Sequence, residues 1–176
     1  MPHCGREKDM EEQQQKRPDG IPGNRHRSRI LALQTVYACE MGGTVDWLPM
    51  LQGIADGSSL NPPVTRYAKE LLSKFYGSTG MIDELIQQKA ANWDMKRMAA
   101  IDRNILRLAA TELSFFKDVP AKVVIDEAVE LAKSFGAEDS GKFVNGIIDS
   151  IHKSLTFNIK TSGKEGSLHG TDTCPK

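Results

Sequence analysis

Apolar residues recur at helical spacing along most of the chain, and no stretch shows a convincing alternation typical of strands. One apolar stripe matches the i, i+3, i+4, i+7 pattern closely and consists of Val64, Tyr67, Ala68, Leu71, Leu72 and Phe75. Helices are expected at 25–41, more weakly at 47–54, then at 62–75, around 82–86, at 94–116, at 120–136 and from 139 or 140 to about 155. Six or seven helices joined by short links predict an all-α bundle.

Local signals place the ends of several of these helices. Gly42 and Gly43 are expected to end the first helix, and Asn61 is expected to cap the helix that starts at Pro62. The segment 94–116 has so broad an apolar surface that a central, mostly buried helix is expected. Gly136 should close the helix that Pro120 opens.

The two ends of the chain differ from this helical body. Residues 1–23 are charged and rich in Gln, and residues 158–176 are rich in Gly, Ser and Thr, so both are expected to be disordered. The body at 24–157 then forms a single helical domain. The start of the chain lacks the apolar core of a secretory signal, and no run of about 18 apolar residues occurs, so a cytoplasmic protein is expected.

Charge and cysteine content narrow the function classes. Lys plus Arg equals Asp plus Glu at 23 each, which excludes a globally basic nucleic-acid binder but not a local basic patch. The three cysteines are scattered, which argues against a disulfide framework or a zinc site, and Cys39 is interpreted as a small buried apolar residue. No catalytic motif is found, and Asp126, Glu127 and Glu130 are interpreted as a solvated face.

One stretch, GAEDSGKF at 136–143, imitates a phosphate-binding loop. It satisfies G-x-x-x-x-G-K, but Phe143 stands where Ser or Thr should bind magnesium, and the stretch follows a helix instead of a strand. Glu138 and Asp139 would also repel phosphate. A helix end followed by the cap of the next helix is the preferred interpretation.

The stretch RHRSRILALQTVY at 25–37 carries the most unusual charge. Arg25, Arg27 and Arg29 lie at the start of a helix, where the helix dipole favours acidic residues. The arginines are either a solvated helix start or a binding site for an anion. Arginine offers forked donors that suit phosphate, and neutralised phosphates release counterions, so RNA is a candidate ligand.

Three segments together resemble the NusB family of transcription antitermination factors. These are RSRILALQTVYACE, IDRNILRLAATEL and DVPAKVVIDEAVELAKSFGAEDSGKFVNGIIDSI, which lie within residues 25–155. The resemblance implies an all-helical fold of two packed small bundles, no enzymatic activity and no cofactor. It implies binding to the boxA segment of ribosomal RNA leader transcripts together with NusE, a small-subunit ribosomal protein, within the RNA polymerase antitermination complex.

The resemblance also assigns roles to single residues. It places Arg25, Arg27 and Arg29 at the RNA, with Tyr37 at an aromatic position of the same helix that either stacks on a base or packs in the core. Lys142 and Phe143 are further RNA-binding candidates, although Phe143 is alternatively an edge residue of the core.

Two further residues, which are not RNA-binding candidates, have roles that the sequence does not decide. Asp102 matches an acidic position that faces NusE, and it otherwise pairs with Arg103 or Arg107 or points to solvent. Gly146 is interpreted as allowing a close approach of helices.

Three other functions remain as alternatives to the antitermination factor. They are a helical RNA-binding module like that of certain ribosomal RNA methyltransferases, a nucleotide-dependent enzyme and a protein-only helical scaffold. The sequence leaves self-association into a homodimer open.

Overall fold

The computed structural model describes residues 23–90 and 93–162, and these form helices and connecting turns without a strand. The helices are α2 (Asn24–Gly42), α3 (Trp47–Gly57), α4 (Pro62–Gly77), α5 (Thr79–Lys89), the short 3-10 turn η2 (Met95–Arg97), α6 (Ala100–Phe115), α7 (Ala121–Phe135) and α8 (Ser140–Ser162). The prediction of an all-α fold is confirmed.

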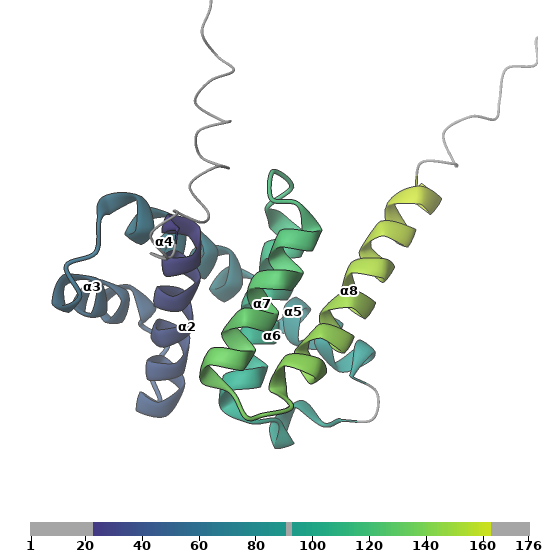
Figure 1. Ribbon diagram of the computed structural model, residues 1–176, viewed down its shortest axis with the longest axis horizontal. Coiled ribbons are helices and arrows are strands. Elements are labelled where there is room, and N and C mark those ends of the chain that lie inside the picture. Colours follow the sequence, from purple (N-terminus) through teal and green to yellow (C-terminus); the bar gives the residue numbers. More distant parts are fainter. Residues whose placement is uncertain (1–22, 91–92, 163–176) are drawn as a thin grey trace, which may run out of the picture.

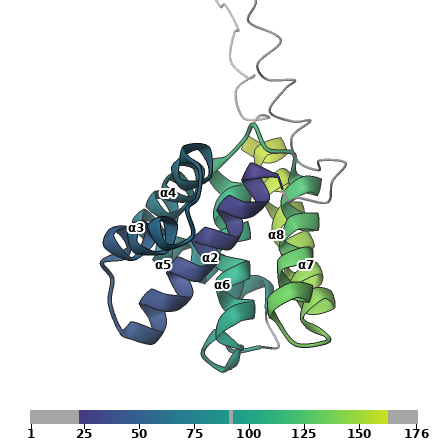
Figure 2. The same ribbon diagram turned by 60° about the vertical axis from the view of Figure 1, so that its left-hand side comes forward.

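The helices form two packed groups that meet at α6 (Figure 1). The first group contains α2, α3 and α4, and the second contains α5, α6, α7 and α8. Turning the view shows α2 crossing α6 between the two groups (Figure 2), and α6 also contacts α4, α5, α7 and α8. Side chains such as Leu106 and Ala110 on α6 are fully buried. The expected pair of small bundles and the expected central helix are both confirmed.

The glycine pair after the first helix ends it as predicted. Gly43 has a φ of 63°, which favours glycine, and its amide donates to the carbonyls near the end of α2. Pro62 stands in the first turn of α4 with Asn61 at the cap position. The Asn61 side chain makes no capping hydrogen bond, however; its Nδ2 donates to Oδ1 of Asn24 over 3.3 Å.

The predicted helix at 94–116 is interrupted in the structure. Asp94 caps the short turn η2 by accepting a hydrogen bond from the Lys96 amide over 2.9 Å, and α6 begins only at Ala100. Arg103 stabilises the interruption by donating to the carbonyls of Met95 and Met98 over 3.0 and 3.1 Å. Apolar spacing continues across the break, which explains why the pattern alone predicted one helix.

The GAEDSGKF stretch forms the connection between α7 and α8. Ser140 Oγ accepts a hydrogen bond from the Ala137 amide over 2.9 Å, and the Asp139 carbonyl accepts the first helical hydrogen bond of α8. Gly136 and Ser140 lie so close that a Cβ on Gly136 would stand 2.5 Å from Ser140 Oγ. The helix-to-helix interpretation is confirmed, and the turn is filled by its own atoms.

The ends of the chain lie largely outside the described residues. This holds for residues 1–22 of the predicted arm and for 163–176 of the predicted tail. The helix α8 continues to Ser162, beyond the boundary expected at 157. Cys39 is buried and has a free thiol, as expected. Within residues 23–90 and 93–162, no helix has the length and apolar character needed to cross a membrane.

Candidate nucleic-acid interface

The start of α2 carries two arginines that solvent reaches. Arg25 lies 4.9 Å above the centre of the Tyr67 ring, and its Nη2 is 3.3 Å from Oδ2 of Asp118. Arg27 is partly exposed, and no hydrogen bond or ion pair joins its guanidinium to another described residue. No acidic residue occupies the first turn of α2. A surface ion pair such as Arg25–Asp118 contributes at most about 1 kcal/mol, so an anion can replace Asp118 at small cost.

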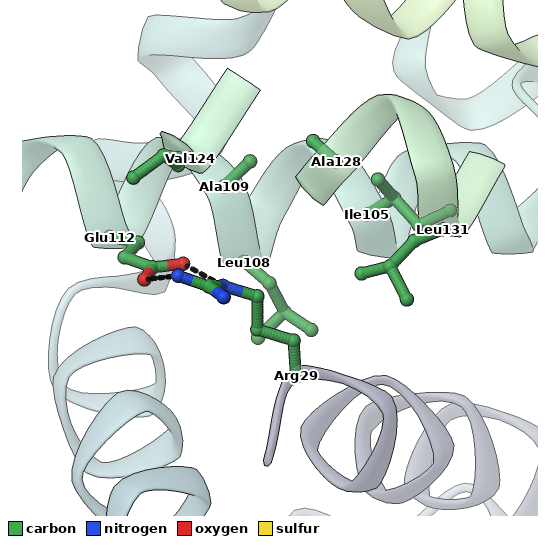
Figure 3. A pocket seen from close by; sticks show the side chains of 8 residues that line it. All are labelled: Arg29, Ile105, Leu108, Ala109, Glu112, Val124, Ala128 and Leu131. Carbon is green, nitrogen blue, oxygen red and sulfur yellow. Dashed lines mark hydrogen bonds and ion pairs between the residues drawn. The ribbon is translucent and has the colours of Figure 1, made fainter. Parts of the chain in front are cut away.

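The third arginine lies inside the protein, which corrects the prediction that it is exposed for phosphate. Arg29 is only 3% exposed. Its Nε and Nη2 donate to the two carboxylate oxygens of Glu112 over 2.9 and 2.5 Å (Figure 3). Its Nη1 lies 3.3 Å from Oε2 of Glu127. Burial alone would lower the pKa of Arg29, but the hydrogen bond and charge of Glu112 outweigh it and raise that pKa. The Arg29 guanidinium therefore already has carboxylate partners.

Tyr67 connects this buried pair to the exposed arginine. Its hydroxyl donates to Oε1 of Glu112 over 2.5 Å, while its ring lies beneath Arg25. Burial, followed by the charge of Glu112, raises the pKa of Tyr67 and keeps the hydroxyl protonated. Sequence reasoning missed both Tyr67 and Glu112. Glu112 had a usable signal, since it interrupts the apolar surface of α6 between Ala109 and Leu113.

A second acidic side chain supports the start of α2 from α7. Glu127 Oε2 is 2.8 Å from Nδ1 of His26, in addition to its contact with Arg29. The interpretation of Glu127 as part of a solvated face is therefore wrong, because the side chain is mostly buried against α2. Glu130, one turn later, is exposed and pairs with Lys133, as expected for a solvated face.

A hollow lies beside the Arg29–Glu112 pair (Figure 3). Its other lining residues are Ile105, Leu108, Ala109, Val124, Ala128 and Leu131, all aliphatic. The two charged residues that line it bind each other, so the hollow lacks the convergent polar groups of a substrate site. Within the described part of the chain, no three His, Cys, Asp or Glu residues cluster as a metal site would require.

The other RNA-binding candidates lie away from the start of α2. In both ribbon views the start of α8, which carries Lys142 and Phe143, is at the end of the molecule opposite to the start of α2 (Figures 1 and 2). Lys142 is exposed and 3.4 Å from Oδ1 of Asp139. Phe143 is partly buried against the core and meets the Trp93 ring edge-on, with centroids 5.5 Å apart and planes at 71°. The six residues predicted to bind RNA therefore do not form one compact patch.

Tyr37 lies in the C-terminal half of α2, beyond the arginines. It follows Arg25 by twelve residues, which corresponds to about 18 Å along a helix axis. Its side chain is 38% exposed and is not part of the buried core. Of the two alternatives, core packing is therefore not what the structure shows, and the role of Tyr37 in base stacking stays a prediction.

Asp102 lies in the first turn of α6, and no basic side chain among the described residues pairs with it. Arg103 binds Glu40, and Arg107 binds both oxygens of Asp83 over 2.8 and 2.7 Å, so neither pairs with Asp102. The Oδ1 atom of Asp102 is buried and has no hydrogen-bond donor among the described residues. Internal pairing, one of the two alternatives for Asp102, is therefore wrong.

The fold and these surface groups define a class of protein: an all-helical domain with a cationic helix start and exposed aromatic rings, which are groups suited to nucleic acid. The sequence profile of the NusB family matches residues 26–153. The chain belongs to the NusB family.

Individual relatives cover the same part of the chain. The transcription antitermination protein NusB of Geotalea daltonii is 42% identical over 139 residues, which are 75% of this chain and 96% of the relative. The protein of the same name from Myxococcus xanthus is 40% identical over 76% of this chain and 97% of its own length.

Solved structures agree with these relatives. T. maritima NusB superposes with a TM-score of 0.70 at 37% identity, covering 76% of this chain and 96% of that chain. A structure of the antitermination factors NusB and NusE in complex with double-stranded RNA matches with a TM-score of 0.69 at 27% identity, covering 74% and 97% of the two chains.

Proposed function

We propose that this chain is a non-enzymatic transcription antitermination factor that binds boxA RNA together with NusE. The single observation that carries the proposal is the start of α2, where Arg25 and Arg27 present positive charge and have no buried acidic partner among the described residues. Membership of the NusB family and the RNA-bound NusB and NusE relative support RNA as the anion.

The two partly exposed arginines of α2, Arg25 and Arg27, bind the phosphates of the RNA. Arg25 is oriented by the Tyr67 ring, and Arg27 is free to meet a phosphate. Guanidinium groups bind phosphate through two parallel hydrogen bonds, which fixes the position of the RNA backbone. Arg29 acts indirectly, because its pair with Glu112 fixes the helix that carries the other two arginines.

The aromatic side chains away from the start of α2 contact the bases of the RNA. Tyr37 on α2 and Phe143 on α8 offer ring faces to unpaired bases, and Lys142 adds a charge beside Phe143. The distance of about 18 Å along α2 between Arg25 and Tyr37 requires a ligand that is long and extended. A single-stranded RNA segment meets that requirement, and a small molecule does not.

Asp102 is proposed as a contact for NusE. A buried carboxylate oxygen without a hydrogen-bond donor destabilises the free protein, and a donor from a partner removes that penalty. An arginine or a lysine of NusE would provide both the donor and the opposite charge. This contact would lie in the first turn of α6. Self-association into a homodimer remains an alternative use of the same surface.

The test is an RNA titration at several salt concentrations. Replacing Arg25 and Arg27 together by Ala should lower the log–log salt slope by about 0.7 for each lost phosphate contact with single-stranded RNA. The matched control replaces the exposed Lys133 and Lys153, which lie on α7 and α8 and should leave the slope unchanged. An unchanged slope in the arginine variant contradicts the proposal and favours a protein-only scaffold.

The same titration with NusE present tests the partner. NusE is expected to tighten boxA binding, and Asp102→Asn is expected to reduce that gain without changing binding of RNA alone. Equal binding of boxA and scrambled RNA under both conditions contradicts sequence-specific recognition.

A further inference from the structure

Trp93 is a large aromatic side chain that lies at the surface on a well-fixed backbone. It is 59% exposed, which is unusual for tryptophan. Its amide donates to the Ala90 carbonyl over 2.7 Å. The Gln87 side chain binds the loop on both sides, because Nε2 donates to the Trp93 carbonyl and Oε1 accepts from the Met95 amide, each over 3.1 Å. Exposure of this ring is therefore built into the turn.

The Trp93 ring meets Phe143 in an edge-to-face contact. The ring centroids are 5.5 Å apart and the planes are at 71°. Phe143 also packs against the hydrophobic core, so the ring that Trp93 meets is held in place. In this arrangement the two rings form a corner at the surface, and a flat apolar group can lie on one ring against the edge of the other.

The surface next to Phe143 is kept open by a glycine. Gly146 follows Phe143 by three residues and therefore lies on the same face of α8. A Cβ placed on Gly146 would meet no atom within 4 Å, so close helix packing, the expected reason for this glycine, is wrong. Glycine inside a helix is destabilising relative to alanine. Packing within the described residues therefore gives no reason for a glycine here.

The turn that follows Trp93 supplies positive charge. Lys96 and Arg97 are exposed, and no hydrogen bond or ion pair joins their side chains to another described residue. The nearby carboxylate of Asp94 is already used, because it accepts the Lys96 amide. A ligand that is flat, apolar on its faces and negatively charged along its length matches this surface.

We propose that Trp93 and Phe143 together form a stacking site for one unpaired base of single-stranded RNA, with Gly146 leaving room for the base and Lys96 and Arg97 facing its phosphates. The proposal rests on the proposed function of RNA binding. It adds Trp93 and Gly146 to the RNA-binding residues and makes the turn before α6 part of the interface.

Fluorescence tests the stacking directly. The chain contains two tryptophans, and Trp47 stacks on Tyr76 with centroids 5.7 Å apart. In the Trp47→Phe variant only Trp93 emits, and boxA RNA should quench that emission on binding. In the matched Trp93→Phe variant only Trp47 emits, and its emission should not change. Quenching of Trp47 alone, or of neither tryptophan while RNA binds, overturns the proposal.

Binding measurements separate this proposal from the proposed function. Trp93→Ala should weaken boxA binding by about 5- to 150-fold, the range for loss of one stacked base, and should leave the salt slope unchanged. Trp93→Phe should retain most of the affinity because it keeps an aromatic face. If Trp93→Ala binds as tightly as the parent while the Arg25 and Arg27 variant still loses salt dependence, only the stacking site is refuted. If the parent does not bind RNA at all, both proposals are refuted.

Gly146→Ala provides an independent readout. It should raise the denaturation midpoint, because it removes a helix-interior glycine, and it should weaken RNA binding by filling the open space. A more stable variant with unchanged RNA affinity contradicts the role of Gly146. If NusE without RNA changes Trp93 emission and RNA does not, the surface is a protein interface and the proposal is wrong.

Discussion

Replacing Arg29 by Met removes one half of the buried ion pair with Glu112. The Glu112 carboxylate is 2% exposed and would keep only the hydroxyl of Tyr67 as a donor. Removing one partner of a buried pair costs about 3–5 kcal/mol, because the other charge stays desolvated. We therefore expect Arg29→Met to lose about that much of the free energy of unfolding.

The reverse change, Glu112→Leu, is expected to cost a similar amount. Arg29 would keep Glu127 at 3.3 Å, but the Tyr67 hydroxyl would lose its acceptor. In the double variant both charges of the Arg29–Glu112 pair are gone, and Glu127 loses Arg29 but keeps His26 as a partner over 2.8 Å. The main remaining penalty is the unpaired Tyr67 hydroxyl, at about 1–3 kcal/mol. The double variant should thus be more stable than either single variant, which is the opposite of additive behaviour.

Urea denaturation of the parent, both single variants and the double variant gives the four free energies of this cycle. Arg29→Lys is the matched control, since it keeps the charge but loses the fork that binds both oxygens of Glu112. RNA titration of the folded Arg29→Met protein should give the parental salt slope. Additive losses in the cycle would show that Arg29 and Glu112 are not coupled. A slope lowered by about 0.7 in Arg29→Met would show that Arg29 meets a phosphate.

Two further predictions concern other parts of the fold. Burial alone would raise the pKa of Glu40, but hydrogen bonds from Asn104 and Arg103 and nearby positive charge lower it below the usual 4.5. The stabilising contribution of the ionised Glu40 carboxylate is therefore complete at neutral pH and is lost as the pH falls below about 4.5. The difference in unfolding free energy between the parent and Glu40→Gln should narrow in that acidic range. A constant difference in denaturation experiments between pH 7 and pH 3.5 contradicts this prediction. Gly136→Ala should destabilise the protein by about 1–3 kcal/mol, because its Cβ would stand 2.5 Å from Ser140 Oγ and 2.7 Å from the Ala132 carbonyl, and a neutral effect in thermal denaturation would refute the tight turn.

Helices were the part of the structure that the sequence predicted well. Their apolar faces repeat at the helical period, and Gly43 and Pro62 mark ends through their own backbone preferences. These are local properties, so a single sequence contains them. The interruption before α6 was missed because it depends on Asp94 and Arg103 hydrogen-bonding to backbone groups, and the apolar pattern is insensitive to such bonds.

The candidate site was predicted less completely, because contacts between distant residues decide it. Arg25 and Arg29 share one face of α2, yet one reaches solvent and the other meets Glu112 from a helix 83 residues later. Spacing along a helix reveals which residues are neighbours on it but not which other helix packs over them. Tyr67 was missed for the same reason, since its position in an apolar stripe gave no sign that its hydroxyl binds a buried carboxylate.

The buried pair and the exposed arginines form one connected structure. Replacing a buried ion pair by apolar residues is often neutral for stability, so the pair between Arg29 and Glu112 is not explained by stability alone. Its geometry has another consequence: Glu112 binds the Tyr67 hydroxyl, and the same ring lies 4.9 Å beneath Arg25. A guanidinium above a fixed ring loses less freedom when it binds an anion than one on a free side chain. The buried Arg29–Glu112 pair thus determines the orientation of a charge at the surface. Removing the Tyr67 hydroxyl should therefore change the orientation of Arg25, although the hydroxyl itself binds Glu112 and not Arg25.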